Sequence, residues 1–162
     1  MHSHAEHGNE KGILMQYSLT YSRTVLKTAK LRIDEGVDTR DKACIVCYLS
    51  LMSSEITLKA VLENLECPLN KIRAFSHDVI KLFNEVSNLE VYEEMHPEKS
   101  EWRKATSIRA QNVDCETYGN GTLGTILGGG LTGLSKLPAE YRYGEVLHDI
   151  DFNLRYKSAV VL

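Results

Sequence analysis

The sequence lacks an excess of basic residues, since 19 Lys and Arg stand against 22 Asp and Glu and give a formal net charge of −3. Proteins that coat nucleic acids need dense clusters of Lys and Arg, because contacts to phosphate dominate that binding. The charge balance therefore excludes nucleic-acid binding by the whole surface. It leaves room for binding by a local patch.

Long apolar runs and a disulfide pattern are lacking as well. The first residues read MHSHAEHGNEKG and contain no apolar signal-peptide core. No window approaches the roughly 18 continuous apolar residues of a membrane span. Four cysteines in a chain that is 43% hydrophobic do not resemble a disulfide scaffold. We therefore expect a soluble, cytoplasmic protein with reduced cysteines and no membrane contact.

Motifs for metals and for nucleotide phosphates are also missing. Cys44 and Cys47 lie in an apolar helical stretch without a second cysteine pair, which favours small core residues over zinc ligands. No segment has the G-x-x-x-x-G-K-[ST] pattern of a phosphate-binding loop. Three histidines lie in the polar leader, where metal binding would be adventitious: His2, His4 and His7. The sequence predicts no cofactor and no specific metal site.

The length of 162 residues fits one domain with its own hydrophobic core. We expect a flexible leader over residues 1–11, a helical bundle domain over residues 12–157 and a short tail over residues 158–162. Strand-like alternation is confined to this tail, which has the sequence SAVVL. No internal repeat and no second domain boundary is present.

Two long helices are expected in the first half of the chain. The first covers residues 13–33 and stops at Gly36. Its apolar residues near one face are Leu14, Tyr17, Tyr21, Val25, Leu26 and Ala29. The second opens at Thr39 or Asp41 and runs to about residue 65, because Pro68 forbids its continuation. Its first half is apolar almost all round, which predicts a place in the middle of the fold.

Further helices are expected in the second half. One begins with Ser76 as N-cap and with Asp78 at the positive end of the helix dipole. It buries residues at helical spacing, namely Val79, Leu82, Phe83 and Val86. A weaker helix is expected from Pro97 to about Arg109, and a last helix over about residues 139–156. Four main helices with short connections predict an all-α, antiparallel up-and-down bundle of four or five helices.

A glycine-rich segment, residues 117–137, precedes the last helix. Seven of the eleven glycines of the chain fall between Gly119 and Gly133, so this segment holds a helix only at a cost. Apolar residues are interleaved with the glycines: Leu123, Ile126, Leu127, Leu131 and Leu134. We therefore expect the segment to pack against the rest of the protein. It would serve as a lid over a groove beside the last helix, or as an interface that orders on association.

The last helix contains a candidate catalytic pair, Arg142 and His148. An imidazole can move a proton to or from a ribose hydroxyl, while a guanidinium binds the phosphate. Six residues correspond to a rotation of about 240° on a helix, so the two side chains do not share a face. They would share a groove if the helix broke near Gly144 or if two copies met across a dimer. The alternative is a surface ion pair of Arg142 and an ordinary half-exposed His148.

Three further residues are candidates for supporting roles. Glu55 lies in an apolar run with Lys59 one turn later. The two make either an ion pair at the edge of the core, which we favour, or a carboxyl in a cleft with a perturbed pKa. Arg73 and His77 flank Ser76, where a helix start beside an arginine can bind an anion. The alternative there is simple capping, with His77 bonded to neighbouring backbone.

These residues carry a resemblance to a known family. The run ACIVCYLSLMSSEITLKAVLENL, then Pro68, then SHDVIKLFNEV resembles the HEPN domain. The shared pattern is an apolar helix with a glutamate and a lysine one turn on, a short loop with proline, and an S-H-D start of the next helix. The letters AEYRYGEVLH are similar to the final helix, with its arginine and downstream histidine. The resemblance covers roughly residues 15–156, apart from the glycine-rich segment.

The resemblance implies an all-α bundle that forms a homodimer through its last helices. It implies metal-independent RNA cleavage by an R-x4–6-H motif in toxin–antitoxin or antiviral defence systems, with Arg142 and His148 as the catalytic pair. Tyr143 and Gly144 depart from the pattern of active members. The alternative is therefore a non-catalytic dimer that binds a nucleotide or a protein, such as an antitoxin or a nucleotidyltransferase. Neither reading implies a cofactor.

Overall fold

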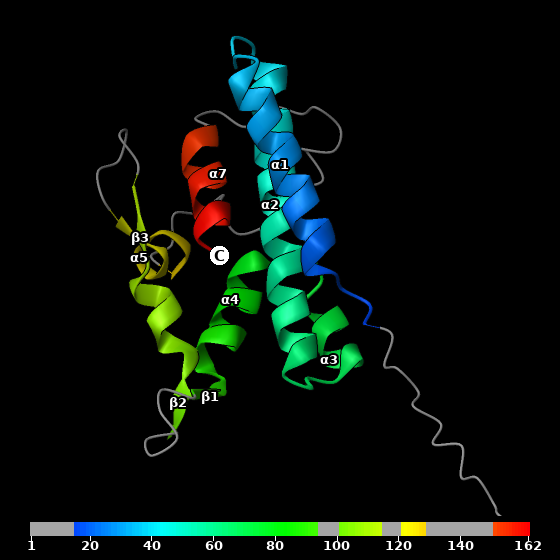
Figure 1. Cartoon of the computed structure of the whole chain (residues 1–162), viewed down its shortest axis with the longest axis vertical. Coiled ribbons are helices and arrows are strands. Elements are labelled where there is room, and N and C mark those ends of the chain that lie inside the picture. Colours follow the sequence, from blue (N-terminus) through cyan, green and yellow to red (C-terminus); the bar gives the residue numbers. More distant parts are fainter. Residues whose placement is uncertain (1–14, 94–100, 115–120, 129–150) are drawn as a thin grey trace, which may run out of the picture.

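The protein is mostly helical, as the sequence predicts (Figure 1). The structure, a computed structural model, describes residues 15–93, 101–114, 121–128 and 151–162. Their helices are α1 (Leu19–Asp34), α2 (Arg40–Asn64), α3 (Leu69–Ala74), α4 (Val79–Asn88), the 3₁₀ helix η1 (Ala105–Ala110), α5 (Leu123–Gly128) and α7 (Phe152–Val161). Their strands are β1 (Glu90–Glu93), β2 (Glu101–Lys104), β3 (Asn112–Val113) and β4 (Gly121–Thr122).

Helix α1 begins later than the sequence pattern suggests. The hydroxyl of Ser18 caps it and accepts a hydrogen bond from the backbone N–H of Tyr21 at 3.2 Å. The predicted stop is confirmed, because Gly36 follows the helix with a φ of +92°, a backbone conformation that favours glycine. The buried residues of α1 are Ser22, Val25 and Ala29. Tyr21 is 53% exposed, so its predicted place on the buried face is wrong.

Helix α2 is the central element of the fold, as expected. Its N-cap is Thr39, and it ends at Asn64, ahead of Pro68. It packs against α1, α4 and α7, with a few contacts to α3 (Figure 1). Fully buried residues extend along its length: Val46, Cys47, Ala60 and Leu62. A helix contacted on several sides has to be apolar on several sides, which accounts for its composition.

The length and composition of α2 alone would allow it to cross a membrane. However, 61% of its most apolar 18-residue window is buried inside the fold. The core helix of a soluble protein meets the same criteria, so the hydropathy of α2 is weak evidence for a membrane span. Its burial against three other helices accounts for the apolar sequence without a membrane.

The turn before α4 differs from the prediction. A short helix, α3, follows Pro68, and the backbone N–H of Ser76 closes it by donating to the carbonyl of Arg73 at 2.9 Å. Ser76 has a φ of +53° and is not the N-cap of α4. Asp78 is the N-cap, with its carboxylate accepting from the N–H of Lys81 at 3.0 Å. A residue in the left-handed region ends one helix and cannot cap the next in the extended conformation.

Helix α4 packs into the core as its spacing predicts. Four of its side chains are at most 2% exposed: Val79, Leu82, Phe83 and Val86. They join residues of α2 and α3, including Leu58, Leu62 and Ile72, in one hydrophobic cluster. The cluster continues into α5 and α7 through Leu123, Ile126, Leu127 and Leu154. One core therefore connects the first and the second half of the chain.

The expected helix from Pro97 to Arg109 is wrong. Residues 101–104 form β2, which pairs antiparallel with β1, with Glu90 opposite Lys104. Pairing with a neighbouring strand overrides local helix propensity here. Only the 3₁₀ helix η1 remains helical, and Arg109 fastens it to α4. Arg109 donates from Nε to the hydroxyl of Ser87 at 3.0 Å, bonds to Asn84, and stacks 5.0 Å from the ring centre of Phe83.

The described part of the glycine-rich segment packs against the core, as expected. Strand β4 pairs with β3, and helix α5 follows. The short helix was not anticipated, but burial stabilises it: Leu123, Ile126 and Leu127 are each at most 7% exposed. Leu131 and Leu134 lie outside the described residues. The proposed lid or interface role stays a prediction.

The C-terminal tail is helical, so its strand-like interpretation is wrong. Helix α7 is capped by Asp151, whose carboxylate accepts from the N–H of Leu154 at 2.9 Å, and it continues to Val161. Its buried residues are Leu154, Arg155, Ser158 and Ala159, which follow a helical period. The segment is too short for its apolar residues to show a helical period in the sequence. Its packing against α2 therefore decides its conformation.

A close approach of α5 to η1 yields a testable prediction. A Cβ added at Gly124 would lie 3.0 Å from both the Cβ and the carbonyl oxygen of Arg109. The start of α5 cannot move away easily, because the N–H of Leu123 donates to the carbonyl of Gln111 at 2.9 Å. We expect Gly124→Ala to lower the free energy of unfolding by about 1–2 kcal/mol, measured by urea denaturation.

Gly121→Ala is the matched control. Its added Cβ would meet only the side chain of Ile126 at 3.5 Å, an ordinary van der Waals distance. We expect a change of less than about 0.5 kcal/mol. Equal unfolding midpoints for the two variants would contradict the close packing of α5 on η1.

Candidate functional site

The site candidates Glu55 and His77 meet beside the C-terminal half of α2. Glu55 and Lys59 project from α2, His77 lies in the turn between α3 and α4, and Tyr17 precedes α1. The group formed by these four side chains is called the Glu55 cluster below. Three segments that are separate in sequence therefore contribute to one cluster.

The carboxylate of Glu55 is the centre of the cluster. Its side chain is only 9% exposed. Lys59 donates from Nζ to Oε1 at 2.7 Å, because residues four apart on a helix lie on the same face. His77 reaches the same carboxylate from the other side, with its Nδ1 at 2.9 Å from Oε2 and 3.1 Å from Oε1. The favoured ion pair is confirmed, and it is buried rather than at the surface.

The ammonium group of Lys59 is also buried, with its side chain 7% exposed. It lies 5.5 Å from the ring centre of Tyr17, within range of a cation–π interaction. A buried charge needs such partners, because removal from water costs several kcal/mol. The carboxylate and the aromatic ring together replace the water that Lys59 loses.

Glu63 places the ring of Tyr17 over the cluster. Its carboxylate accepts from the backbone N–H of Gln16 at 2.7 Å and from that of Tyr17 at 2.8 Å. The segment before α1 is thereby tied to α2 two turns beyond Glu55. Neither Tyr17 nor Glu63 was a site candidate, because their contacts join segments 46 residues apart in sequence.

The imidazole of His77 is oriented by the carboxylate. An ionised carboxylate only accepts hydrogen bonds, so Nδ1 must carry the proton that joins it to Glu55. In the neutral ring, Nε2 is then an acceptor. The side chain is 48% exposed, and Nε2 makes no hydrogen bond to any described residue. An oriented and accessible ring nitrogen can accept a proton from a ligand or bind one of its donors.

Arg73 lies beside the cluster without joining it. Its guanidinium donates to the side-chain oxygen of Gln16 at 2.8 Å. The start of α4 is occupied by the carboxylate of Asp78, which would repel an anion at that point. His77 bonds to Glu55 and not to neighbouring backbone. The predicted anion site at the N-terminus of this helix therefore lacks support.

The candidate pair of Arg142 and His148 lies outside the described residues, as does Gly144. Their cooperation in one groove stays a prediction. The part of the chain that the structure describes brings Glu55 and His77 together but places Arg73 on Gln16. Within these ranges, no group of three or more His, Cys, Asp or Glu side chains is arranged to hold a metal ion.

The Cys44-x-x-Cys47 pair belongs to the core, as predicted. Both cysteines are buried and free. Burial raises the pKa of the Cys47 thiol to about 12, against a smaller lowering by Arg155 and smaller increases by Cys44 and Asp151. Cys47 is therefore a protonated, unreactive core residue at neutral pH.

Comparison with known proteins found no match: no protein-family model, no curated protein and no solved structure matches the chain. The functional argument therefore rests on the Glu55 cluster and on the sequence pattern that it contains.

Glu55→Gln tests the buried cluster. The amide cannot neutralise Lys59, so a buried ammonium is left without its counter-charge. We expect the free energy of unfolding to fall by about 3 kcal/mol in urea denaturation at neutral pH. The double variant Glu55→Gln/Lys59→Met should recover part of this loss, because it removes the orphaned charge.

Glu85→Gln is the matched control, since the Glu85 side chain is 25% exposed and pairs at 2.6 Å with Lys71, which is 54% exposed. We expect a loss of under about 1 kcal/mol there. A loss at Glu55 no larger than that at Glu85 would mean that the cluster is solvated and not a buried constraint.

The raised pKa of Cys47 yields a prediction for alkaline pH. The thiol ionises near pH 9 in the unfolded chain but stays protonated in the fold up to about pH 12. The unfolded state therefore releases a proton that the folded state keeps, and stability falls as pH rises above 9. Between pH 8 and pH 10 this effect amounts to about 1.4 kcal/mol.

Cys47→Ala isolates this contribution, because all other titrating groups are common to both proteins. The free energy of unfolding of the variant should decline less between pH 8 and pH 10 than that of the unmodified protein. Parallel pH profiles would show that Cys47 does not titrate differently on folding.

Proposed function

We propose that the chain is a HEPN-like helical domain that acts on RNA as a metal-independent endoribonuclease of the toxin or defence type. The observation that supports this proposal is the Glu55 cluster. The residues that carry the sequence resemblance meet in this cluster. The lysine one turn after the glutamate and the histidine of the S-H-D start both bind the buried carboxylate of that glutamate.

The cluster gives a physical reason for the resemblance. The turn before α4 needs a fixed position relative to α2. The buried carboxylate of Glu55 provides it, because it binds both Lys59 and His77. A solvated ion pair would need neither the burial of Glu55 nor a histidine at position 77. The motif residues therefore behave as one unit, which favours a common origin of the pattern over coincidental spacing.

In the proposed reaction, Arg142 binds the scissile phosphate and stabilises the charge that develops on it. His148 moves a proton to or from the ribose hydroxyl, so no metal ion and no cofactor is needed. On the last helix that the sequence predicts, Arg142 and His148 point to different faces, so we propose a homodimer in which two such helices line one groove.

The exposed Nε2 of His77 fits a role in binding. It is held by Glu55 at the protein surface and accepts a hydrogen bond from a donor such as a ribose hydroxyl. Arg73, which is exposed nearby on α3, adds a positive charge for a phosphate. We place the protein in the cytoplasm, with an antitoxin or a nucleotidyltransferase as the class of protein partner.

An RNA-cleavage assay in excess chelator tests the proposal. We expect cleavage of RNA by the unmodified protein, and a loss of at least about 100-fold with Arg142→Ala or His148→Ala, the range typical for one acid–base group. His7→Ala in the leader is the control histidine and should cleave normally. Cleavage that persists in His148→Ala would remove the catalytic assignment.

A thermal-shift measurement with nucleotides separates catalysis from binding. A nucleotide present at about 100 times its Kd stabilises a protein by about 2.7 kcal/mol. Stabilisation that His77→Ala abolishes, in a protein that cleaves no RNA, would replace the nuclease by a non-catalytic nucleotide-binding module. If the protein neither cleaves RNA nor is stabilised by a nucleotide, the nuclease proposal and the nucleotide-binding alternative are both wrong.

A further inference from the structure

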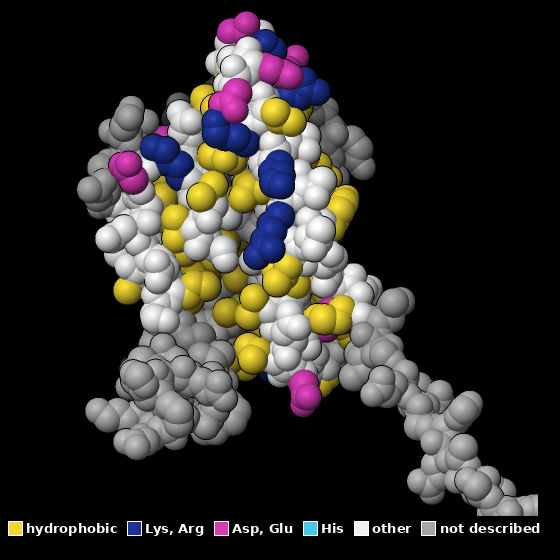
Figure 2. Space-filling view, viewed as in Figure 1, with side chains coloured by type: hydrophobic (Ala, Val, Ile, Leu, Met, Phe, Trp, Pro, Cys, Tyr) yellow, Lys and Arg dark blue, Asp and Glu magenta, His cyan; other side chains and the backbone are white. Residues whose placement is uncertain are grey.

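Helix α1 carries charge of one sign only along most of its length. Its residues from Leu19 to Ile33 include four basic side chains and no acidic one. Three of them, Arg23, Lys27 and Lys30, are spaced i, i+4 and i+7 and are all exposed. They therefore form a row on one face, which is called the basic ridge below. Figure 2 shows Lys and Arg side chains following α1, with several acidic side chains near the turn between α1 and α2 and a few elsewhere on this face.

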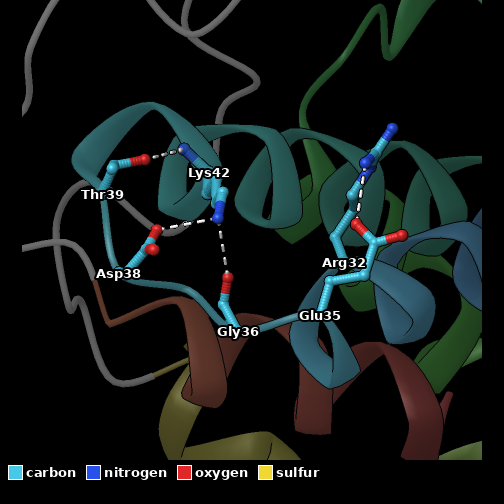
Figure 3. Close-up of polar contacts among 6 residues, drawn as sticks. All are labelled: Arg32, Glu35, Gly36, Asp38, Thr39 and Lys42. Atoms are coloured by element: carbon cyan, nitrogen blue, oxygen red, sulfur yellow. Dashed lines mark hydrogen bonds and ion pairs between the residues drawn. The ribbon is translucent and has the colours of Figure 1, made fainter.

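Two other cations at this end of the molecule, Arg32 and Lys42, have acidic partners. Arg32 pairs with Glu35 at 2.8 Å, and Lys42 pairs with Asp38 at 2.8 Å while it also donates to the carbonyl of Gly36 (Figure 3). These pairs hold the turn between α1 and α2 together. Such partners are what an ordinary solvated surface provides for its cations.

Two of the three residues of the basic ridge differ from that pattern. Lys30 pairs with Asp34, but Arg23 and Lys27 form no ion pair and no hydrogen bond with any described residue. Successive members of the ridge are about 6 Å and 4.5 Å apart along the helix axis. These spacings are below the Debye length of about 8 Å at physiological salt, so the charges act as one positive stripe.

We propose that the basic ridge of α1 binds the phosphate backbone of single-stranded RNA. This inference rests on the RNA-directed function proposed above and adds the surface along which the RNA lies. A net charge of −3 rules out binding by overall charge, so a local stripe has to provide the attraction.

Two observations favour RNA over an anionic membrane. A helix that lies on a membrane must insert a continuous apolar face, but α1 is packed on α2 through Val25 and Ala29. Its exposed large apolar side chains, Tyr21 and Leu31, lie ten residues apart and form no such face. In addition, α7 packs against α1, and its Tyr156 is half-buried. The carboxylate of Asp34 is the main cause that raises the pKa of Lys30, and the Tyr156 phenol is near enough to contribute. An aromatic ring beside a basic stripe suits the stacking of an unpaired base.

The experiment measures binding separately from cleavage. The probe is a fluorescent single-stranded RNA with 2′-O-methyl riboses, which lacks the free hydroxyl that the proposed cleavage needs. Its affinity for the full chain is followed by anisotropy between 50 and 200 mM salt. Each phosphate contact contributes about −0.7 to the slope of log K against log salt. For Arg23→Gln/Lys27→Gln we expect a slope that is smaller by about 1.4 and about tenfold weaker binding at low salt.

Arg32→Gln/Arg40→Gln is the matched control, with the same change of net charge. Arg32 lies nine residues from Arg23, about half a turn round the helix, and Arg40 begins α2. The control should show the same slope of log K against log salt as the unmodified protein. Equal losses in the two double variants would overturn the ridge, because net charge would then explain the binding.

The remaining outcomes separate this inference from the proposed function. Unchanged binding by Arg23→Gln/Lys27→Gln, with cleavage that still depends on His148, would remove the ridge and leave the nuclease intact. Absence of binding to the RNA probe, together with binding to vesicles that contain phosphatidylserine, would overturn the ridge as an RNA surface in favour of a membrane.

Discussion

The fold depends on a charge that is buried in its central helix. Helix α2 is covered on several sides, so the carboxylate of Glu55 and the ammonium group of Lys59 cannot both reach bulk water. Each therefore needs partners within the protein, and these come from outside α2 as well as from within it. His77 fixes the turn before α4, and Tyr17 fixes the segment before α1. A charge that is costly to bury thus fixes the positions of two other segments relative to α2.

The same constraint connects structure to the proposed chemistry. Because the Nδ1 of His77 is held by Glu55, the other ring nitrogen has a fixed position at the surface. Arg73 and the basic ridge supply positive charge on other elements, α3 and α1. Recognition of a polyanion by a protein of net charge −3 requires such separate and local positive groups. In the proposed function, different elements of the fold therefore orient the RNA, attract its phosphates and cleave it.

Local signals in the sequence predicted what lies within one helix. The cap at Thr39, the stop at Gly36 and the burial of Phe83 follow from residue type and spacing alone. The Glu55–Lys59 pair follows from its spacing on α2. Strand β2 and the part of α7 beyond Tyr156 were missed, because pairing and docking decide the conformation of short segments. The contact of His77 with Glu55 also depends on tertiary structure, since 22 residues separate them.

The tautomer of His77 is the most direct test of this account, because it reports on the contact with Glu55 at the level of a single proton. Nitrogen-15 NMR of the imidazole in the neutral form distinguishes the protonated from the unprotonated ring nitrogen. The account predicts that Nδ1 carries the proton and that Glu55→Gln shifts the population of the two tautomers. A ring with its proton on Nε2, or a tautomer mixture that does not respond to Glu55→Gln, would contradict it.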